Sequence, residues 1–178
     1  TAAPPHTARQ LLDEAALTVA ISQIADRILA RHEDVTALAL IGIPSRGVEL
    51  ASRVAAVIAA RSGKVPLSGA IDISMHRDDI GLRPTLEVAT SHVPCSLDGV
   101  LVVLVDDVLF TGRTVRAALD ALIEFGRPRA VRLAVMVDRG HRELPIRPDF
   151  VGKNLPTHVS DEVLVQLSGV EVFPGAHA

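Results

Sequence analysis

A hydrophobic run that ends in two adjacent carboxylates is the part of this sequence best suited to chemistry. Asp106 and Asp107 follow the branched aliphatic run 100–105, and the turn 110–114 then leads into a helical pattern. The free N–H groups and the positive dipole at the start of a helix favour an anion such as phosphate. Carboxylates beside a phosphate would repel it, so the two acids are expected to accept hydrogen bonds from sugar hydroxyls or to hold a hydrated metal ion.

The residue types within this turn support the same chemistry. Gly112 permits close backbone approach, and the hydroxyls of Thr111 and Thr114 can donate to phosphate oxygens. The run 100–105 is typical of a strand buried on both faces, and ligands bind at the carboxyl ends of such strands. The alternative is a solvated strand end followed by a helix whose N-cap is Thr111 or Thr114.

Two other loops carry groups that could bind anions. Ser45, Arg46 and Gly47 lead into a helical pattern and would suit a second anion, although a solvent-facing turn residue is an equally good interpretation of Arg46 alone. The segment 76–98 is polar and has no clear periodicity, so it is predicted to be a long loop that acts as a lid. Arg77 could then reach over a bound polyphosphate, with a solvated charge cluster as the alternative.

The elements that must position these loops alternate between strand and helix patterns. Strands are expected at 11–12, 37–41, 67–74, 100–105, 131–137, 150–151 and 163–167. Helices are expected from Ala16 to Leu29 with Asp13 as N-cap, from Val48 to a stop at Ser62 and Gly63, and from Thr114 to Leu122. This order predicts an α/β fold in which helices cover both faces of a parallel sheet, within one domain spanning residues 1–178.

Composition restricts the classes of function. The 178 residues include 48% hydrophobic residues, enough for a full core, and 18 basic against 21 acidic side chains give a net charge of −3. An RNA partner would therefore need a local basic patch. A single cysteine, Cys95, rules out an intramolecular disulfide and a cysteine-rich metal site. Without a membrane-length apolar run or a signal-peptide pattern in residues 1–10, a cytoplasmic protein is expected.

The string from Val102 to Thr114 resembles the signature of type I phosphoribosyltransferases, which bind 5-phosphoribosyl-1-diphosphate (PRPP) there. The resemblance implies the type I phosphoribosyltransferase fold with a flexible lid loop at about 76–98. It makes Asp106, Asp107 and Arg77 the catalytic residues, with both acids on the ribose hydroxyls. Mg²⁺ is the implied cofactor, bound mainly through PRPP, with the two acids as candidate protein ligands. The implied PRPP-binding residues are Ser45, Arg46, Gly47, Val108, Leu109, Phe110, Thr111, Gly112, Arg113 and Thr114.

A second string narrows the resemblance. Residues 138–147 and 150–154, together with 76–79 and 126–128, resemble the PyrR family of bifunctional pyrimidine operon regulators and uracil phosphoribosyltransferases, and the similarity covers nearly the whole chain. It implies that uracil and PRPP are converted to UMP and diphosphate, and that a bound uridine nucleotide, UMP or UTP, promotes binding to the pyrimidine-operon mRNA leader. A homodimer or a larger homo-oligomer is also implied. The implied uracil contacts are Val137, Asp138, Arg139 and Val163, and the implied RNA contacts are His141, Arg142, Arg147 and Lys153.

The RNA contacts have alternatives. Arg142 and Arg147 could instead form surface ion pairs with Glu143 and Asp149. With no Trp or Tyr and 2% aromatic residues, stacking platforms for unpaired bases are also scarce.

The first helix departs from the family pattern. It carries Gln23 and Asp26 where some relatives have RNA contacts, and Asp26 would repel phosphate. RNA control could therefore be altered or weak. Two other functions remain open: a catalytically weak, UMP-sensing RNA-binding regulator, and a purine phosphoribosyltransferase, because the signature does not choose the base.

Overall fold

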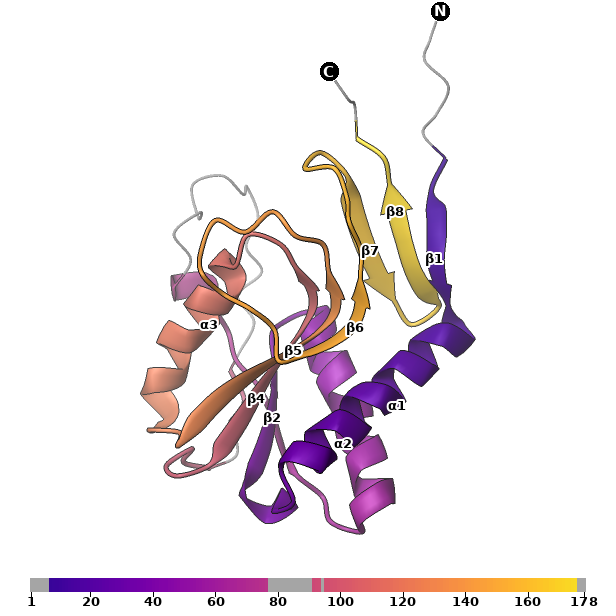
Figure 1. Ribbon diagram of the computed structural model, residues 1–178. Coiled ribbons are helices and arrows are strands. Elements are labelled where there is room, and N and C mark those ends of the chain that lie inside the picture. The colour runs from indigo at the N-terminus through magenta and orange to yellow at the C-terminus, as the bar shows by residue number, and fades with distance from the viewer. Residues whose placement is uncertain (1–6, 77–90, 94, 176–178) are drawn as a thin grey trace, which may run out of the picture.

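Five parallel strands form the central sheet of the computed structural model, which describes residues 7–76, 91–93 and 95–175 (Figure 1). They lie in the order β3-β2-β4-β5-β6. Their bounds are Leu38–Gly42 for β2, Leu67–Ala70 for β3, Leu101–Leu109 for β4, Ala130–Asp138 for β5 and Phe150–Asn154 for β6. Every neighbouring pair is parallel, which brings the carboxyl ends together at one edge and confirms the predicted α/β fold.

Helices cover both faces of this sheet, as predicted. The helices α1 (Glu14–Arg31) and α2 (Arg46–Ser62) pack on one face, and α3 (Arg113–Leu122) packs on the other. Side chains alternate along a strand, so β4 directs Val103 into the core under α1 and α2 and Leu104 into the core under α3. Burial on both faces explains why this strand is a continuous apolar run.

The predicted start of α1 and the predicted end of α2 are both confirmed. Asp13 Oδ1 accepts a hydrogen bond from the Ala16 N–H at 2.8 Å, which caps α1. Gly63 follows α2 in the left-handed conformation at φ 69°, and its N–H donates to Ala59 O.

Several predicted strands differ in length from the strands of the structure. The strand predicted at 67–74 ends at Ala70, and a 3₁₀ turn occupies Ser74–His76. Ile71 and Ile73 are nevertheless buried, so the alternating pattern there indicated burial rather than a strand. The strand predicted at 100–105 instead runs to Leu109, because its pairing with β5 continues beyond the two acids.

A second sheet lies beside the start of α1 (Figure 1). It contains β1 (Arg9–Asp13), β7 (Glu162–Gln166) and β8 (Gly169–Phe173), paired antiparallel in the order β1-β8-β7. The sequence predicted β1 and β7 as strands, but neither β8 nor a separate sheet. In the described part of the chain, no helix is both long enough and apolar enough to cross a membrane.

Candidate active site

The carboxyl ends of the central strands surround a cleft of ≈ 630 Å³. The two acids, the turn that follows them and the first turn of α3 form most of its lining. The residues around it are Pro44, Asp106, Asp107, Val108, Leu109, Phe110, Thr111, Gly112, Arg113, Thr114, Val115, Arg139, Glu143 and Val163. The structure thus brings the whole predicted segment 106–114 to one cavity.

The two adjacent acids differ in exposure. Asp106 is 6% exposed, whereas Asp107 is half-buried at the cleft. The Asp107 N–H donates to Asp106 Oδ1 at 2.9 Å, and the Val108 N–H donates to Asp107 Oδ1 at 2.7 Å. These bonds fix the orientation of both carboxylates. Within the described residues, no group donates to the second oxygen of Asp107, so this oxygen can accept from a hydroxyl in the cleft.

The turn between β4 and α3 has the geometry of an anion site. Gly112 is the N-cap of α3 at φ 94°, a conformation that L side chains rarely adopt. The helix begins with the Arg116 N–H donating to Gly112 O at 3.0 Å, and the Arg113 N–H contacts Thr111 Oγ1 at 3.3 Å. The positive end of the dipole of α3 therefore points at the same cleft as the carboxylates.

A loop after β5 supports this turn from outside. The N–H groups of Glu143 and Leu144 donate to Thr111 O at 2.9 and 3.1 Å. The Glu143 side chain also accepts from Arg113 Nε at 2.8 Å. The anion-binding turn is therefore fixed by residues that lie about 30 positions away in sequence.

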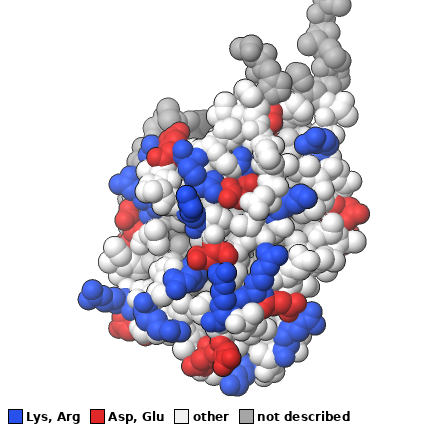
Figure 2. Space-filling model, in the orientation of Figure 1, with Lys and Arg blue, Asp and Glu red and all other residues white. Residues whose placement is uncertain are grey.

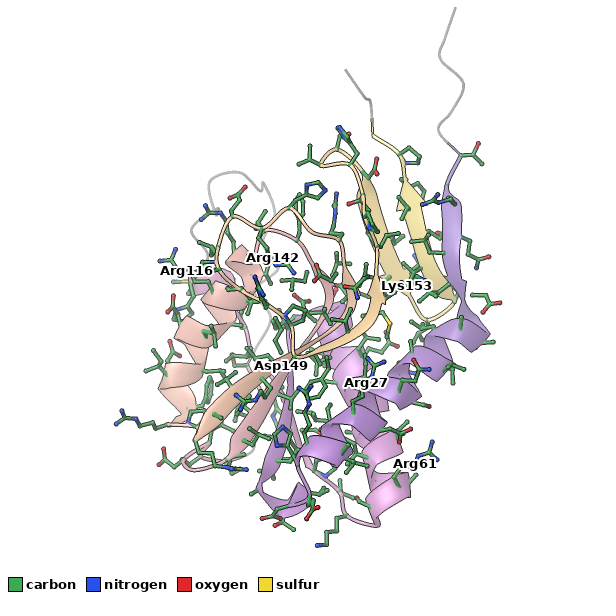
Figure 3. All side chains as sticks on the ribbon, viewed as in Figure 1. Arg27, Arg61, Arg116, Arg142, Asp149 and Lys153 are labelled. Atoms are coloured by element: carbon green, nitrogen blue, oxygen red, sulfur yellow. The ribbon has the colours of Figure 1, made fainter. Side chains whose placement is uncertain are left out.

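Arg142 holds the same loop together from within (Figure 3). Its guanidinium pairs with Asp138 Oδ2 at 2.7 Å and donates to Ile146 O at 2.8 Å and Phe110 O at 2.9 Å. The predicted alternative of an ion pair with Glu143 is wrong, since the partner is Asp138. Only 22% of the Arg142 side chain is exposed.

Two side chains, those of Arg139 and His141, pack on the Phe110 ring. We call these three side chains the Phe110 wall. The guanidinium of Arg139 lies 4.1 Å from the centroid of the Phe110 ring, and the His141 ring packs edge-on against Phe110 with 5.8 Å between the ring centroids. Arg139 is buried and donates to Thr157 Oγ1 at 3.0 Å and His158 O at 2.8 Å. Burial lowers the pKa of Arg139 below its usual value.

The loop before α2 lies against the first acid. The Ile43 N–H donates to Val105 O at 2.9 Å, and the Pro44–Ser45 peptide that follows is cis. A Cβ on Gly47 would lie 2.4 Å from Val105 O and 3.2 Å from Asp106 Cα, so only glycine fits there. Ser45 is exposed and Arg46 is half-buried, and Arg46 forms no ion pair with a carboxylate of the described residues.

The residues predicted to contact uracil divide into two groups. Val163 and Arg139 line the cleft, and Val163 comes from the second sheet. Val137 is fully buried, and Asp138 accepts from Gly140 and Arg142. The Arg139 N–H already donates to Leu109 O at 3.1 Å.

Sequence reasoning missed three lining residues, Pro44, Val115 and Glu143. Pro44 and Val115 directly flank predicted segments, so their position was the available signal. No local pattern could pair Glu143 with Arg113. Arg77 lies outside the described residues.

The predicted RNA residues lie on more than one part of the molecule. Arg147 and Lys153 are exposed, and Lys153 projects from β6 (Figure 3). His141 Nε2 lies 2.6 Å from Thr157 O beside the Phe110 wall. Asp26, predicted to repel phosphate, pairs with Arg61 at 3.1 Å, and about half of each side chain is exposed.

Comparison with known proteins decides the family. Residues 7–167 match the phosphoribosyl transferase domain family. The chain is 50% identical over 168 residues to the bifunctional protein PyrR of Leifsonia xyli subsp. xyli, covering 92% of both chains. It is 52% identical over 161 residues to the bifunctional protein PyrR of Chloroflexus aurantiacus, covering 89% of this chain and 88% of that one. The chain belongs to the PyrR family of phosphoribosyltransferases.

Solved structures place this PyrR-family chain in the phosphoribosyltransferase fold. A hypoxanthine phosphoribosyl transferase of Trypanosoma cruzi superposes with a TM-score of 0.71 at 18% identity, covering 97% of this chain and 94% of that one. A hypoxanthine phosphoribosyltransferase of Staphylococcus aureus superposes with a TM-score of 0.69 at 15% identity, covering 94% and 92%. At these identities the likeness concerns the fold alone. The predicted type I phosphoribosyltransferase fold is confirmed.

Proposed function

We propose that the chain transfers the phosphoribosyl group of PRPP to uracil, which gives UMP and diphosphate. The observation that carries this proposal is the convergence of two fixed carboxylates and the N-terminus of α3 on one cleft. Identity of about half to PyrR proteins over about nine-tenths of the chain supports uracil as the base.

The ribose phosphate has a matching set of partners. Asp107, and Asp106 beside it, accept hydrogen bonds from the ribose 2′- and 3′-hydroxyls. The 5′-phosphate binds at 110–114, where the N–H groups at the start of α3 and the Thr111 hydroxyl serve as donors. Because the turn is held by the loop after β5, little reorganisation is needed when PRPP binds.

The diphosphate lies toward the loop before α2. Ser45 and Arg46 supply a hydroxyl and a cation beside Asp106, and Arg77 is proposed to approach from the lid. Mg²⁺ is usually held by one or two carboxylates together with substrate phosphates, and the two adjacent acids would supply such carboxylates. The described residues hold no cluster of three or more metal-binding side chains that could bind the ion without PRPP. When bound, Mg²⁺ would neutralise charge on the diphosphate.

The transfer itself needs positioning more than covalent help. The bond from C1′ to the diphosphate oxygen breaks as the bond from C1′ to uracil N1 forms, and N1 gives up its proton to the departing diphosphate or to water. Holding both reactants in line can contribute roughly 7–11 kcal/mol. Val163 packs against the base, and backbone carbonyls near Arg139 accept from its N–H, while the Phe110 wall excludes water from this side.

The second half of the proposed function is regulation of pyrimidine biosynthesis. The chain binds the mRNA leader of the pyrimidine operon when UMP or UTP occupies the cleft, as a homodimer or larger assembly in the cytoplasm. The similar proteins are named bifunctional protein PyrR, which supports two roles. The exposed cations Arg147 and Lys153 are the strongest of the predicted RNA contacts, because Arg142 is committed to its own loop.

One assay tests the reaction. UMP formation is measured with uracil, PRPP and Mg²⁺, with hypoxanthine and adenine as competing bases and a chelator as control. We expect UMP as the main product and loss of turnover with the chelator. Preference for a purine would contradict the uracil assignment, and binding of UMP without turnover would favour the regulator that lacks catalysis.

A further inference from the structure

One face of the molecule gathers cations although the net charge is −3 (Figure 2). Figure 3 locates Arg27 of α1, Lys153 of β6 and, to the left of both, Asp149 on this side. The Arg27 guanidinium donates to Val151 O at 3.1 Å, which ties α1 to β6. We define the basic face by six residues near the carboxylate of Asp149. They are Arg27, Arg31, Arg129, Arg132, Arg147 and Lys153.

Three cations of this face lie near His32, the residue that follows α1. His32 Nε2 is shielded from solvent and has no hydrogen-bond partner among the described residues. Its pKa is lowered first by burial and then by the nearby charges of Arg132 and Arg129, with a smaller effect from Arg31. Asp149 acts in the opposite direction. A neutral imidazole thus sits among three guanidinium groups.

Two cations of this cluster already contact the protein, since the Arg31 guanidinium lies 5.3 Å from the centroid of the Phe150 ring and Arg132 Nη1 donates to Val131 O at 3.3 Å. The described carboxylates form no ion pair with Arg31, Arg129 or Arg132. Asp149 Oδ2 accepts instead from the Leu133 N–H at 2.9 Å, which fixes this carboxylate against β5. Grouped cations repel one another, and an anion relieves this repulsion.

The shape of the basic face distinguishes a polymer from a small anion. Lys153 is level with Val137 in the sheet, five residues along β5 from Arg132. At the rise of a strand this is about 16 Å. A single phosphate cannot span that distance, whereas successive phosphates of a nucleic-acid strand can.

We propose that the cluster of Arg31, Arg129 and Arg132 around His32 binds backbone phosphates of RNA and extends the RNA surface beyond Arg147 and Lys153. This rests on the RNA half of the proposed function. Phosphate contacts position RNA without reading its sequence, so the cluster strengthens binding rather than choosing the target. It also supplies positive charge near the end of α1, whereas Gln23 and Asp26 within α1 supply none.

The test uses the full chain with Arg129→Ala and Arg132→Ala combined. The matched control, Arg9→Ala with Arg53→Ala, removes the same charge from β1 and α2. Binding of fluorescein-labelled oligouridylate and of the pyrimidine-operon leader is measured over a range of salt concentrations, with inorganic phosphate as competitor. UMP formation is measured for each variant to establish that the fold and cleft are intact.

We expect the Arg129/Arg132 variant to bind both RNAs more weakly, with a salt dependence shallower by about 1.4 in log–log slope, or about 0.7 per lost contact. When salt is raised from about 50 to about 200 mM, affinity falls by some factor in each protein. This factor should be about sevenfold smaller for the variant than for the unsubstituted chain. The Arg9/Arg53 control should retain the original slope. UMP formation should be unchanged in both.

Three results would overturn the assignment. Unchanged affinity and slope in the Arg129/Arg132 variant, with RNA binding by the unsubstituted chain, would overturn this site alone. Loss of phosphate competition without loss of RNA affinity would show a small-anion site instead. Absence of RNA binding by the unsubstituted chain would overturn both this site and the RNA half of the proposed function, while UMP formation would report separately on the enzyme.

Discussion

Replacing Arg142 should damage the cleft rather than only an RNA contact. The Arg142 guanidinium binds Asp138 at 2.7 Å and the carbonyl oxygens of Ile146 and Phe110 at 2.8 and 2.9 Å. Arg142→Ala removes these bonds together and leaves the half-buried Asp138 carboxylate without its partner. The carbonyl of Phe110 belongs to the turn that is proposed to hold the 5′-phosphate, so loosening it should weaken PRPP binding.

The magnitude follows from the number and exposure of these bonds. A hydrogen bond to a charged group contributes about 1.5–3 kcal/mol when it is buried. Because the side chains of Arg142 and Asp138 are 22% and 18% exposed, solvent screening reduces that value. We expect a total loss of about 2–4 kcal/mol in the free energy of unfolding. In a chain of this length that corresponds to a fall of about 5–15 °C in Tm.

Calorimetry and UMP formation at several PRPP concentrations would measure both effects. Arg142→Lys should recover only part of the loss, because a lysine cannot reproduce the planar fork of donors. Arg147→Ala, at an exposed position in the same loop, is the matched control and should keep its Tm and its KM for PRPP. The reasoning would be refuted if Arg142→Ala kept normal stability and transfer and lost only RNA affinity.

Three further predictions concern the acids, a glycine and a histidine. Asp107→Asn should fold normally and lose most UMP formation, because an acceptor for a ribose hydroxyl becomes a partial donor; normal turnover would mean that the signature is misread. Gly47→Ala places a Cβ 2.4 Å from Val105 O and should cost about 1–3 kcal/mol in urea unfolding with a parallel loss of activity. Burial holds the pKa of His32 below its usual 6.5, so the unfolded chain binds the proton first; this contribution to stability is complete above pH 6.5 and is lost as pH falls through the folded pKa. Thermal unfolding of His32→Gln should therefore depend less on pH in this acidic range, and an identical dependence would contradict the assignment.

Local patterns predicted most of the central sheet and its helices. Asp13 and Gly63 bounded helices as expected, because capping depends on residues a few positions apart. Strand ends were less predictable. The strand at 67–74 was too long because buried irregular backbone and a strand share the same apolar alternation, as Ile71 and Ile73 illustrate. β8 was missed, since its pairing with β1 joins the two ends of the chain.

The candidate site divides in the same way. The acids and the turn that follows are contiguous in sequence, so residue types and spacing alone were enough to predict most of the cleft lining. The alternative ion pair between Arg142 and Glu143 was wrong, because sequence cannot choose between Glu143 and Asp138 as the partner. Which carboxylate it meets depends on how the loop folds back on Phe110.

The sequence by itself determined the family, the alternation of strands and helices, and the segment that lines the proposed PRPP cleft. The family follows from the resemblance of whole motifs, whereas contiguous residues impose the alternation and the segment through backbone propensity and hydrophobic periodicity. Only the tertiary structure decided which residues meet across long separations: Val163 reaching the cleft, Glu143 holding Arg113, and the cations collected around His32. Such contacts depend on strand order and loop closure, for which a one-dimensional pattern carries no distance information.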